Sequence, residues 1–405
     1  MKLKLALAVL GGLAASGAAG ASSAAADVGT CTRESFGSAA TALRAAKAEL
    51  MAAPLGEPDI SVPPTTGRKI EAVKDRLRVY VQTAMACAPT SVEPEALAAA
   101  MEQRAGTSDS RGEPGETGRP GPDRHGGTLT YEVSRVKAHP DMLAVVTTVG
   151  IKCGSDSMLM LYRRTRTGWE ELIVRRADPY GEVRGGWQDL RFDVSPADAQ
   201  GRWFVATVST TPWCSSSWQG LRYALARPAE DPARPKVFLD EKTVTWLGAE
   251  EELQVRAEED AFELRHVAGS IDPAVHNRRH VRRYSVSGEA ARRVPPVADS
   301  ARDFVDEWIV SPWAEAKAWS AADPRLAALH AQLNTGRFEL LGEFASIRAC
   351  RKGMTQVEIG SEKGPGWYFL VRDRRDSPWW MERAGRKADP GCTGPNSLGR
   401  EPARD

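Results

Sequence analysis

The chain has 405 residues, a formal net charge of +1 and 42% hydrophobic residues. This length allows two or three domains of ordinary size, and the hydrophobic fraction is sufficient for a sizeable core. The near-neutral charge excludes a strong field toward nucleic acid or an anionic membrane surface, so the sequence predicts no nucleic-acid partner.

Residues 1–26 have the pattern of a secretory signal peptide. Lys2 and Lys4 form a cationic start, a short apolar run follows, and residues 24–26 are the small residues that a signal peptidase requires. The apolar run is well short of the roughly 20 residues needed to cross a bilayer. The sequence therefore predicts a secreted or periplasmic protein without a transmembrane anchor, whose mature chain begins near Asp27.

Residues 27–105 are predicted to form a helical module. Ile70 and Leu77 belong to a series of apolar residues at spacings of three and four, which lie on one face of a helix. Ala-rich stretches at 38–51 and 95–103 predict two further helices. We interpret the module as a structural cap on the main domain; a docking module for another protein is the alternative.

Residues 106–127 are predicted to be a disordered linker, because Ser, Gly, Pro and charged residues dominate and almost nothing there can be buried. Glycine recurs at every third position for a few triplets, as in collagen. So few triplets cannot form a triple helix, and the segment is interpreted as an extended spacer.

Residues 128–392 are predicted to form a repeat β domain, in which short β-branched and aromatic runs alternate with turn residues. Tyr162, Tyr223 and Tyr284 are separated by 61 residues each time. Cys153 and Cys214 have the same separation and precede their tyrosines equally. This agreement indicates one repeating unit.

Each unit is predicted to be a meander of four antiparallel strands. The two middle strands are expected at 143–149 with 158–164, 203–209 with 221–227, 262–267 with 281–286, and 355–359 with 367–372. The first and last strands are expected at 131–136 and 170–174, 190–194 and 236–239, 243–246 and 291–294, and 338–344 and 379–381. Such repeats are typical of a mainly β, β-propeller-like fold; a β-sandwich or two smaller β domains are the alternatives.

A helical insertion is predicted at about 300–333, within the β domain. Ser300 and Asp303 have the spacing of a helix cap, and Pro312 and Pro324 are placed to start further helices. The insertion is expected to cover an open face of the sheets, or alternatively to gate a ligand site. Residues 393–405 are expected to be a flexible tail.

Cysteine usage predicts disulfides, since the cysteines all lie in the exported part and their number is even. The sequence order favours three local pairs, which are Cys31 with Cys87, Cys153 with Cys214, and Cys350 with Cys392. Other pairings remain open at this level. No closely spaced pair typical of a zinc site occurs.

One cluster of polar residues, Asp272, His276 and His280 with His266 nearby, could hold a metal ion or relay a proton. No Glu follows His276 as a zinc-protease pattern requires, and Pro273 interrupts the segment. We therefore interpret it as a basic surface loop and assign neither a metal nor a cofactor.

Two tryptophans, Trp213 and Trp218, flank Cys214 in a loop of small residues. Flat aromatic faces held rigidly at a surface can stack on sugar rings or bury against a protein. They are the candidate ligand-binding residues, with core packing as the structural interpretation.

Signatures of nucleotide-binding sites and of serine hydrolases are missing from the sequence. The sequence thus favours an exported non-enzymatic protein, either a binding protein or a structural component of the envelope. Its partner would be a protein or a glycan. The alternative is an extracellular hydrolase acting on carbohydrate, which needs only two suitably spaced carboxylates.

Overall fold

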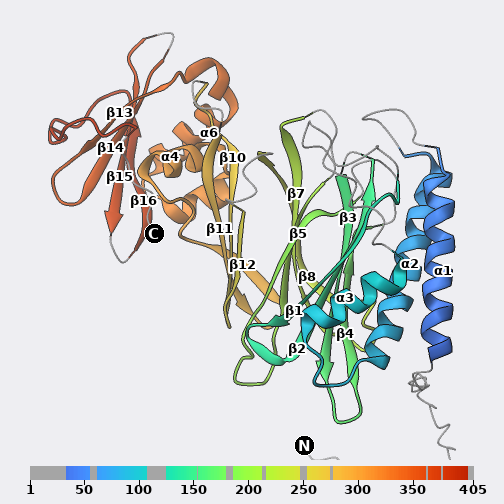
Figure 1. Ribbon diagram of the computed structural model, residues 1–405. Helices are drawn as coiled ribbons and strands as arrows, with labels where there is room; N and C mark the ends of the chain where they lie inside the picture. The colour runs from blue at the N-terminus through green and yellow to red at the C-terminus, as the bar shows by residue number, and fades with distance from the viewer. Residues whose placement is uncertain are drawn as a thin grey trace, which may run out of the picture.

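The structure is a computed structural model (Figure 1) that describes residues 33–54, 62–106, 125–152, 154–178, 186–211, 216–246, 253–273, 277–361, 364–374 and 377–399. The predicted signal peptide at 1–26 and most of the predicted linker lie outside these ranges. Within them, no helix combines the length and the apolar character needed to cross a membrane.

Three helices form the N-terminal module: α1 (Arg33–Met51), α2 (Pro64–Cys87) and α3 (Pro94–Ala105). Proline occupies the first turn of both α2 and α3, where its missing N–H leaves no hydrogen bond unmade. The predicted apolar face of α2, including Ile70 and Leu77, is buried. It shares one core with the first β-sheet, so the module covers the outer face of that sheet.

In the described part of the chain, sixteen strands form four sheets, each of which is an antiparallel meander with its strands in chain order. Sheet 1 contains β1 (Leu129–Val136), β2 (His139–Ile151), β3 (Gly154–Arg164) and β4 (Trp169–Arg176). Sheet 2 contains β5 (Gln188–Val194), β6 (Val205–Thr210), β7 (Trp218–Arg227) and β8 (Lys236–Trp246). Sheet 3 contains β9 (Gln254–Ala257), β10 (Ala261–Gly269), β11 (Asn277–Ser287) and β12 (Ala290–Val294). Sheet 4 contains β13 (Phe344–Ala349), β14 (Met354–Ile359), β15 (Trp367–Arg374) and β16 (Ser377–Gly385).

These meanders confirm the predicted fold class, a mainly β, propeller-like succession of four-stranded sheets behind a helical module. Tyr162, Tyr223 and Tyr284 lie on β3, β7 and β11, the third strand of three successive sheets. The repeat inferred from their spacing is therefore confirmed.

Two of the predicted first strands are wrong. Residues 243–246 belong to β8, which pairs with β7 along its whole length, and sheet 3 instead begins with Gln254–Ala257. Residues 338–340 end helix α6 (Pro324–Leu340), so sheet 4 begins only at Phe344. In the first case the pairing partner continues to the end of β8, which a pattern of alternating residues within one strand cannot reveal.

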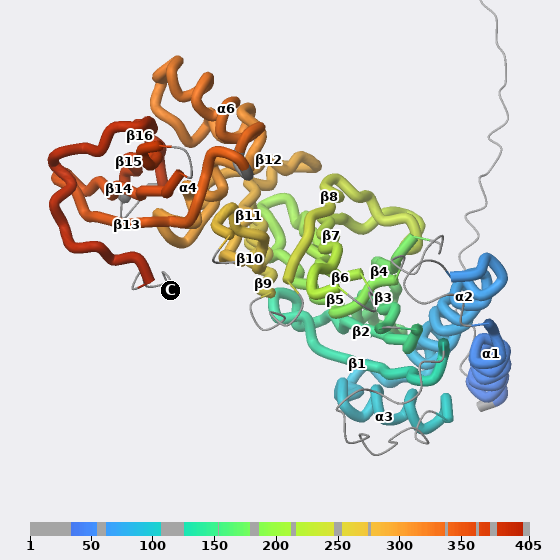
Figure 2. Tube along the Cα trace, turned by 90° about the horizontal axis from the view of Figure 1, so that it is seen from above, coloured from blue at the N-terminus to red at the C-terminus, as the bar shows by residue number. Residues whose placement is uncertain are grey.

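The sheets follow one another in space in chain order, as Figure 2 shows from above. One hydrophobic core joins sheets 1 and 2, and another joins sheets 2 and 3. Because sheet 1 is also covered by the helical module, its central strands carry long apolar runs, as in 158–162. Sheets 1 and 4 lie at opposite ends of the row (Figure 2).

The helical insertion lies between sheets 3 and 4. It contains α4 (Ala301–Val310), α5 (Trp313–Ala316), a short 3-10 helix (Lys317–Trp319) and α6. The predicted cap is present, since Ser300 Oγ accepts a hydrogen bond of 3.1 Å from the Asp303 N–H. The helices share a core with sheet 4. The insertion extends past the predicted limit of 333 to Leu340.

Cys350 and Cys392 form the predicted disulfide. Cys87 is also disulfide-bonded. Cys31, Cys153 and Cys214 lie outside the described residues, and their pairing stays a prediction. The expectation of a flexible tail is wrong for residues 393–399, because backbone hydrogen bonds attach them to β13. Residues 400–405 are outside the described part of the chain.

Candidate functional site

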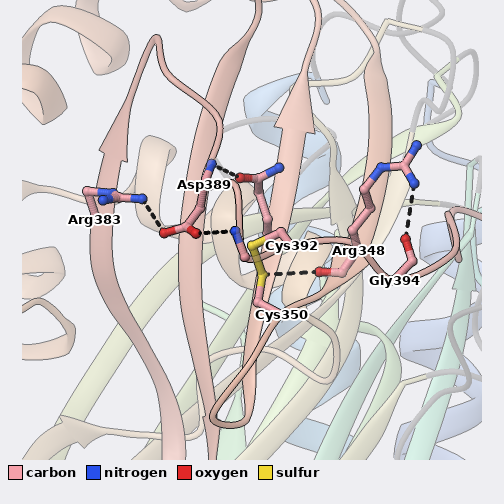
Figure 3. Close-up of a disulfide and its surroundings, with 8 residues drawn as sticks. Arg348, Cys350, Arg383, Asp389, Cys392 and Gly394 are labelled. Atoms are coloured by element: carbon pink, nitrogen blue, oxygen red, sulfur yellow. Dashed lines mark hydrogen bonds and ion pairs between the residues drawn. A yellow bond between two sulfur atoms is a disulfide. The ribbon is translucent and has the colours of Figure 1, made fainter.

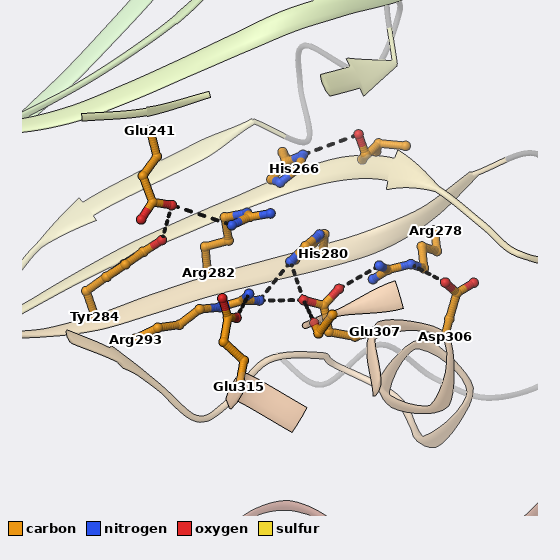
Figure 4. Close-up of polar contacts among 12 residues, drawn as sticks. Glu241, His266, Arg278, His280, Arg282, Tyr284, Arg293, Asp306, Glu307 and Glu315 are labelled. Carbon is orange, nitrogen blue, oxygen red and sulfur yellow. Dashed lines mark hydrogen bonds and ion pairs between the residues drawn. The ribbon is translucent and has the colours of Figure 1, made fainter. Parts of the chain in front are cut away.

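A polar group between sheets 2 and 3 consists of Tyr223, Glu241, Arg282 and Tyr284. Figure 4 shows the last three of these residues. Both tyrosine hydroxyls donate to Oε2 of Glu241, with a donor–acceptor distance of 2.8 Å for Tyr284. The two hydroxyl oxygens lie 2.9 Å apart. Arg282 Nη1 donates to the Tyr223 hydroxyl at 3.0 Å and lies 3.7 Å from the same carboxylate oxygen. Groups from two sheets therefore converge on one oxygen.

The strand pattern explains this convergence. Arg282 and Tyr284 are two residues apart on β11, so their side chains share one face of sheet 3. On sheet 2, Tyr223 of β7 lies directly opposite Glu241 of β8 in the strand register. Directly opposed side chains in an antiparallel pair are close neighbours, so each sheet supplies a preformed half of the group.

A related arrangement occurs on sheet 1, where Tyr162 lies opposite Glu171 and donates to it at 3.1 Å. There the arginine is Arg78 of α2, which donates to Glu171 at 2.7 Å. Arg78 of the helical module thus has the role at Glu171 that Arg282 of β11 has at Glu241. The Glu171 side chain is only 10% exposed, whereas that of Glu241 is 42% exposed, so solvent molecules reach Glu241 far more readily.

Both tyrosines beside Glu241 are fully buried. Burial is the main cause that raises the pKa of Tyr223, and it also raises the pKa of Tyr284. Their hydroxyls consequently remain protonated donors at neutral pH. The buried hydroxyls are rigid supports, and the exposed carboxylate is the group that a solute could contact.

A second polar cluster links sheet 3 to α4 around the buried carboxylate of Glu307 (Figure 4). Arg278 Nη2 and Arg293 Nη2 each donate to it at 2.6 Å. His280 Nε2 lies 3.2 Å from the same carboxylate, and Ser311 Oγ donates to it at 3.0 Å. The Glu307 side chain is 2% exposed, so these contacts compensate a charge that water does not solvate.

Burial and charge act on this cluster in opposite directions. Burial by itself raises the pKa of Glu307, but the charged arginines and the hydrogen bond from His280 outweigh it and hold that pKa well below the usual value. Burial lowers the pKa of His280 to about 3 and likewise lowers that of His266. At neutral pH, the cluster therefore contains an ionised glutamate, charged arginines and neutral histidines.

The structure gives the predicted polar candidates different contacts, so that Asp272 does not join the two histidines in one group. His266 and His280 stack with ring centroids 4.9 Å apart. Asp272 instead accepts a hydrogen bond of 3.2 Å from Phe344 N–H and lies 4.0 Å from Arg302. The interpretation of this segment as a solvated loop is wrong for His266, Asp272 and His280, which are buried. His276 lies outside the described residues, and among those described no three His, Cys, Asp or Glu side chains form a metal-binding group.

Of the two candidate tryptophans, Trp213 lies outside the described residues. Trp218 is partly buried at the start of β7 and packs edge-on against Trp246, with ring centroids 4.9 Å apart. Its six-membered ring also approaches Gly269 of sheet 3. A ligand-binding role for either residue stays a prediction.

Sequence reasoning missed Glu241 and Arg282 as site residues. The tyrosine spacing identified Tyr223 and Tyr284 as repeat markers but not as hydrogen-bond donors. The period-2 series of Arg, His, Arg and Tyr on β11 was an available signal, because a buried strand face seldom carries so many charged groups unless they are paired.

No protein-family model and no curated protein matches the chain. Solved structures with detectable similarity include an α-L-arabinanase of Penicillium chrysogenum complexed with arabinobiose, at 10% identity and a TM-score of 0.26 over 65% of this chain and 67% of that one. A mutant α-L-arabinofuranosidase of Fusarium graminearum with an iminosugar inhibitor has 7% identity and a TM-score of 0.25 over the same shares. An α-L-arabinofuranosidase of Podospora anserina complexed with cellotriose has 11% identity and a TM-score of 0.20 over 62% and 65%.

All three of these proteins are named as an arabinanase or an arabinofuranosidase. This finding contradicts the first interpretation of the sequence, a non-enzymatic binding or envelope structural protein. Similarity this low assigns no residue of this chain a role.

Proposed function

We propose that the protein is an exported hydrolase acting on carbohydrate and that Glu241 is a reacting carboxylate. The observation that carries the proposal is the fixed, partly exposed carboxylate of Glu241 between two buried tyrosines. Its Oε2 takes the contacts from both hydroxyls and from Arg282. A group held in one geometry before the substrate arrives is what efficient catalysis requires.

A carboxylate can act in glycoside hydrolysis as nucleophile or as base. The tyrosines and Arg282 come from rigid strands, so Glu241 loses little conformational freedom when a sugar binds beside it. The tyrosine hydroxyls remain protonated donors and orient the carboxylate without reacting themselves. They are positioning residues for Glu241.

Glycoside hydrolysis usually needs a second carboxyl group. Glu315 of α5 is a candidate, since its side chain is 37% exposed and receives a hydrogen bond of 2.6 Å from Arg293. Arg293 lies directly opposite Tyr284 in the strand register, which connects Glu315 to the group around Glu241. In this proposal Glu315 is the second carboxyl group of the site.

The test uses purified protein and a panel of aryl glycosides and oligosaccharides, including arabinosides. Glu241→Gln is expected to lower kcat by about 10²- to 10⁴-fold, and Glu315→Gln by a similar factor. Glu289→Gln is the matched control, because Glu289 is an exposed carboxylate paired with Lys236 on the surface. Absence of hydrolysis across the panel, or full activity of Glu241→Gln, would reject the proposal.

A further inference from the structure

The C-terminal segment lies along the outer edge of β13 and continues sheet 4 beyond its first strand (Figure 3). Ser397 N–H donates to the Ile347 carbonyl at 2.9 Å, and Gly394 N–H donates to the Ala349 carbonyl at 3.2 Å. Arg348 and Asn396 form an antiparallel bridge between the two segments. An uncovered edge strand presents unpaired backbone N–H and C=O groups that can pair with a strand of another chain. This segment covers such an edge. We name residues 393–399 the tail strand.

Side chains of the tail strand fit this edge specifically. The Asn396 amide accepts from Ile347 N–H at 3.0 Å and donates to the Ala345 carbonyl at 3.3 Å, so it replaces backbone groups of a regular strand. A Cβ on Gly394 would lie 2.9 Å from the Ala349 carbonyl oxygen, a distance that real Cβ atoms essentially never show. Glycine and asparagine at these positions therefore match β13 in a way that an arbitrary peptide does not.

Little apolar burial holds the tail strand. Thr393, Pro395 and Asn396 are exposed, and Leu398 is the partly buried apolar side chain that packs on the core of sheet 4. The disulfide between Cys350 and Cys392 fixes the start of the segment beside the end of β13, with a Cα–Cα distance of 4.0 Å. Covalent attachment thus keeps a weakly held strand at high local concentration.

We propose that the outer edge of β13 is a strand-accepting surface that the tail strand occupies in its own chain because of the Cys350–Cys392 disulfide, and that the tail strand of a second copy occupies it once that bond is opened. An exchanged tail makes every contact described above in the same geometry, so exchange sacrifices no hydrogen bond. The turn at Pro390 and Gly391, directly before Cys392, is the hinge.

The exchange proceeds by thiol–disulfide chemistry with a small dithiol. A thiolate of the dithiol attacks one sulfur of the protein disulfide, forms a mixed disulfide and releases the other cysteine as thiolate. The second thiol of the reagent then displaces the protein, which leaves two protein thiols and a cyclic disulfide. The reverse reaction closes Cys350 of one copy onto Cys392 of the other, so the two steps together leave the reagent unchanged.

The experiment mixes isotope-labelled and unlabelled full-length mature protein in a buffer of a dithiol and its oxidised form, at several protein concentrations. Free thiols are then alkylated, and the products are analysed by non-reducing peptide mapping and by size-exclusion chromatography with light scattering. Hybrid pairs with Cys350 from one isotope and Cys392 from the other are expected, together with a dimer that increases with protein concentration. Without the dithiol, neither is expected.

Asn396→Ala removes the side-chain hydrogen bonds to β13 from the native and the exchanged form alike. It is therefore expected to release the tail strand more often and to raise the rate of hybrid formation in the dithiol buffer about tenfold, with the final yield unchanged. Thr393→Ala, an exposed position of the same segment, is the matched control and should leave the rate unchanged. A protein that stays monomeric without hybrid pairs would overturn the proposal. So would hybrid pairs that form no faster in Asn396→Ala than in the natural protein, because that result indicates disulfide scrambling that does not require the tail strand to leave β13.

Discussion

The hydroxyl oxygens of Tyr223 and Tyr284 lie 2.9 Å apart, although the residues belong to different sheets and stand 61 positions apart in the chain. They also share one core cluster, in which sheets 2 and 3 meet. Two repeat-related side chains therefore face each other across the sheet interface and hold the same carboxylate. The proposed site exists only when these two sheets are docked.

Tyr284→Phe removes a hydroxyl that donates to Glu241 and leaves the ring in place. We expect a loss of about 1 to 2 kcal/mol in the free energy of unfolding, because one hydrogen bond to a charged group disappears within a buried network. Urea unfolding measures this loss. Tyr368→Phe is the control, since its hydroxyl bonds to Glu358 on the more open sheet 4. Equal, negligible effects of both substitutions would contradict the prediction.

Glu307→Gln removes the carboxylate that pairs with both Arg278 and Arg293, which also pair with Asp306 and Glu315, respectively. Because both arginine side chains are almost fully buried, we expect a loss of about 3 to 5 kcal/mol in the free energy of unfolding. Glu315→Gln breaks a partly exposed pair and should cost less than about 1 kcal/mol. Denaturant titration of both variants tests the difference, and comparable losses would show that burial does not determine the cost.

We expect the titration of His280 to contribute to the pH dependence of the free energy of unfolding. Its pKa is about 3 in the folded protein, below the ordinary value of 6.5, so the unfolded chain binds the proton more tightly. Its contribution to stability is therefore present above pH 6.5 and is lost as the pH falls from there toward 3.

We expect His280→Gln to lose a few kcal/mol less stability than the natural protein between pH 7 and pH 4, as measured by urea unfolding at each pH. Asp303 acts in the opposite direction, since burial raises its pKa to about 6, but it is present in both proteins. Parallel pH profiles for the two proteins would refute the assignment to His280.

Lys74 fastens α2 to sheet 1 through its buried ammonium, which lies 3.0 Å from Asp156 and 3.1 Å from Glu71. Lys74→Met should cost about 3 to 5 kcal/mol, because it leaves the Asp156 carboxylate buried without that cation. Lys69→Met on the same helix breaks only an exposed hydrogen bond and is the control. The midpoints of urea unfolding compare the two variants. If Lys74→Met leaves the free energy of unfolding unchanged, apolar packing alone holds the module on sheet 1.

Much of the architecture follows from local pattern. The apolar series through Ile70 predicts α2, and alternating runs with turn residues predict most strands, because both reflect the period of a single element. The spacing of Tyr162, Tyr223 and Tyr284 predicts the repeat for a different reason, because equal distances along the chain mark equivalent positions of successive sheets. The predicted strands at 243–246 and 338–340 were wrong, because the structure of these residues depends on the neighbouring strand or helix. Glu241 gave no local signal, since its partners Tyr284 and Arg282 come from another sheet.

The sequence by itself determined the order of most helices and strands and the repeat, and it favoured the pairing of Cys350 with Cys392 without deciding it, since these features are visible along the chain. Only the tertiary structure decided that Glu241 meets Tyr284, that Glu307 neutralises buried arginines of sheet 3, and that the tail strand covers β13. These contacts depend on which faces dock, and docking is governed by the summed burial of whole sheets, which no single stretch of sequence encodes.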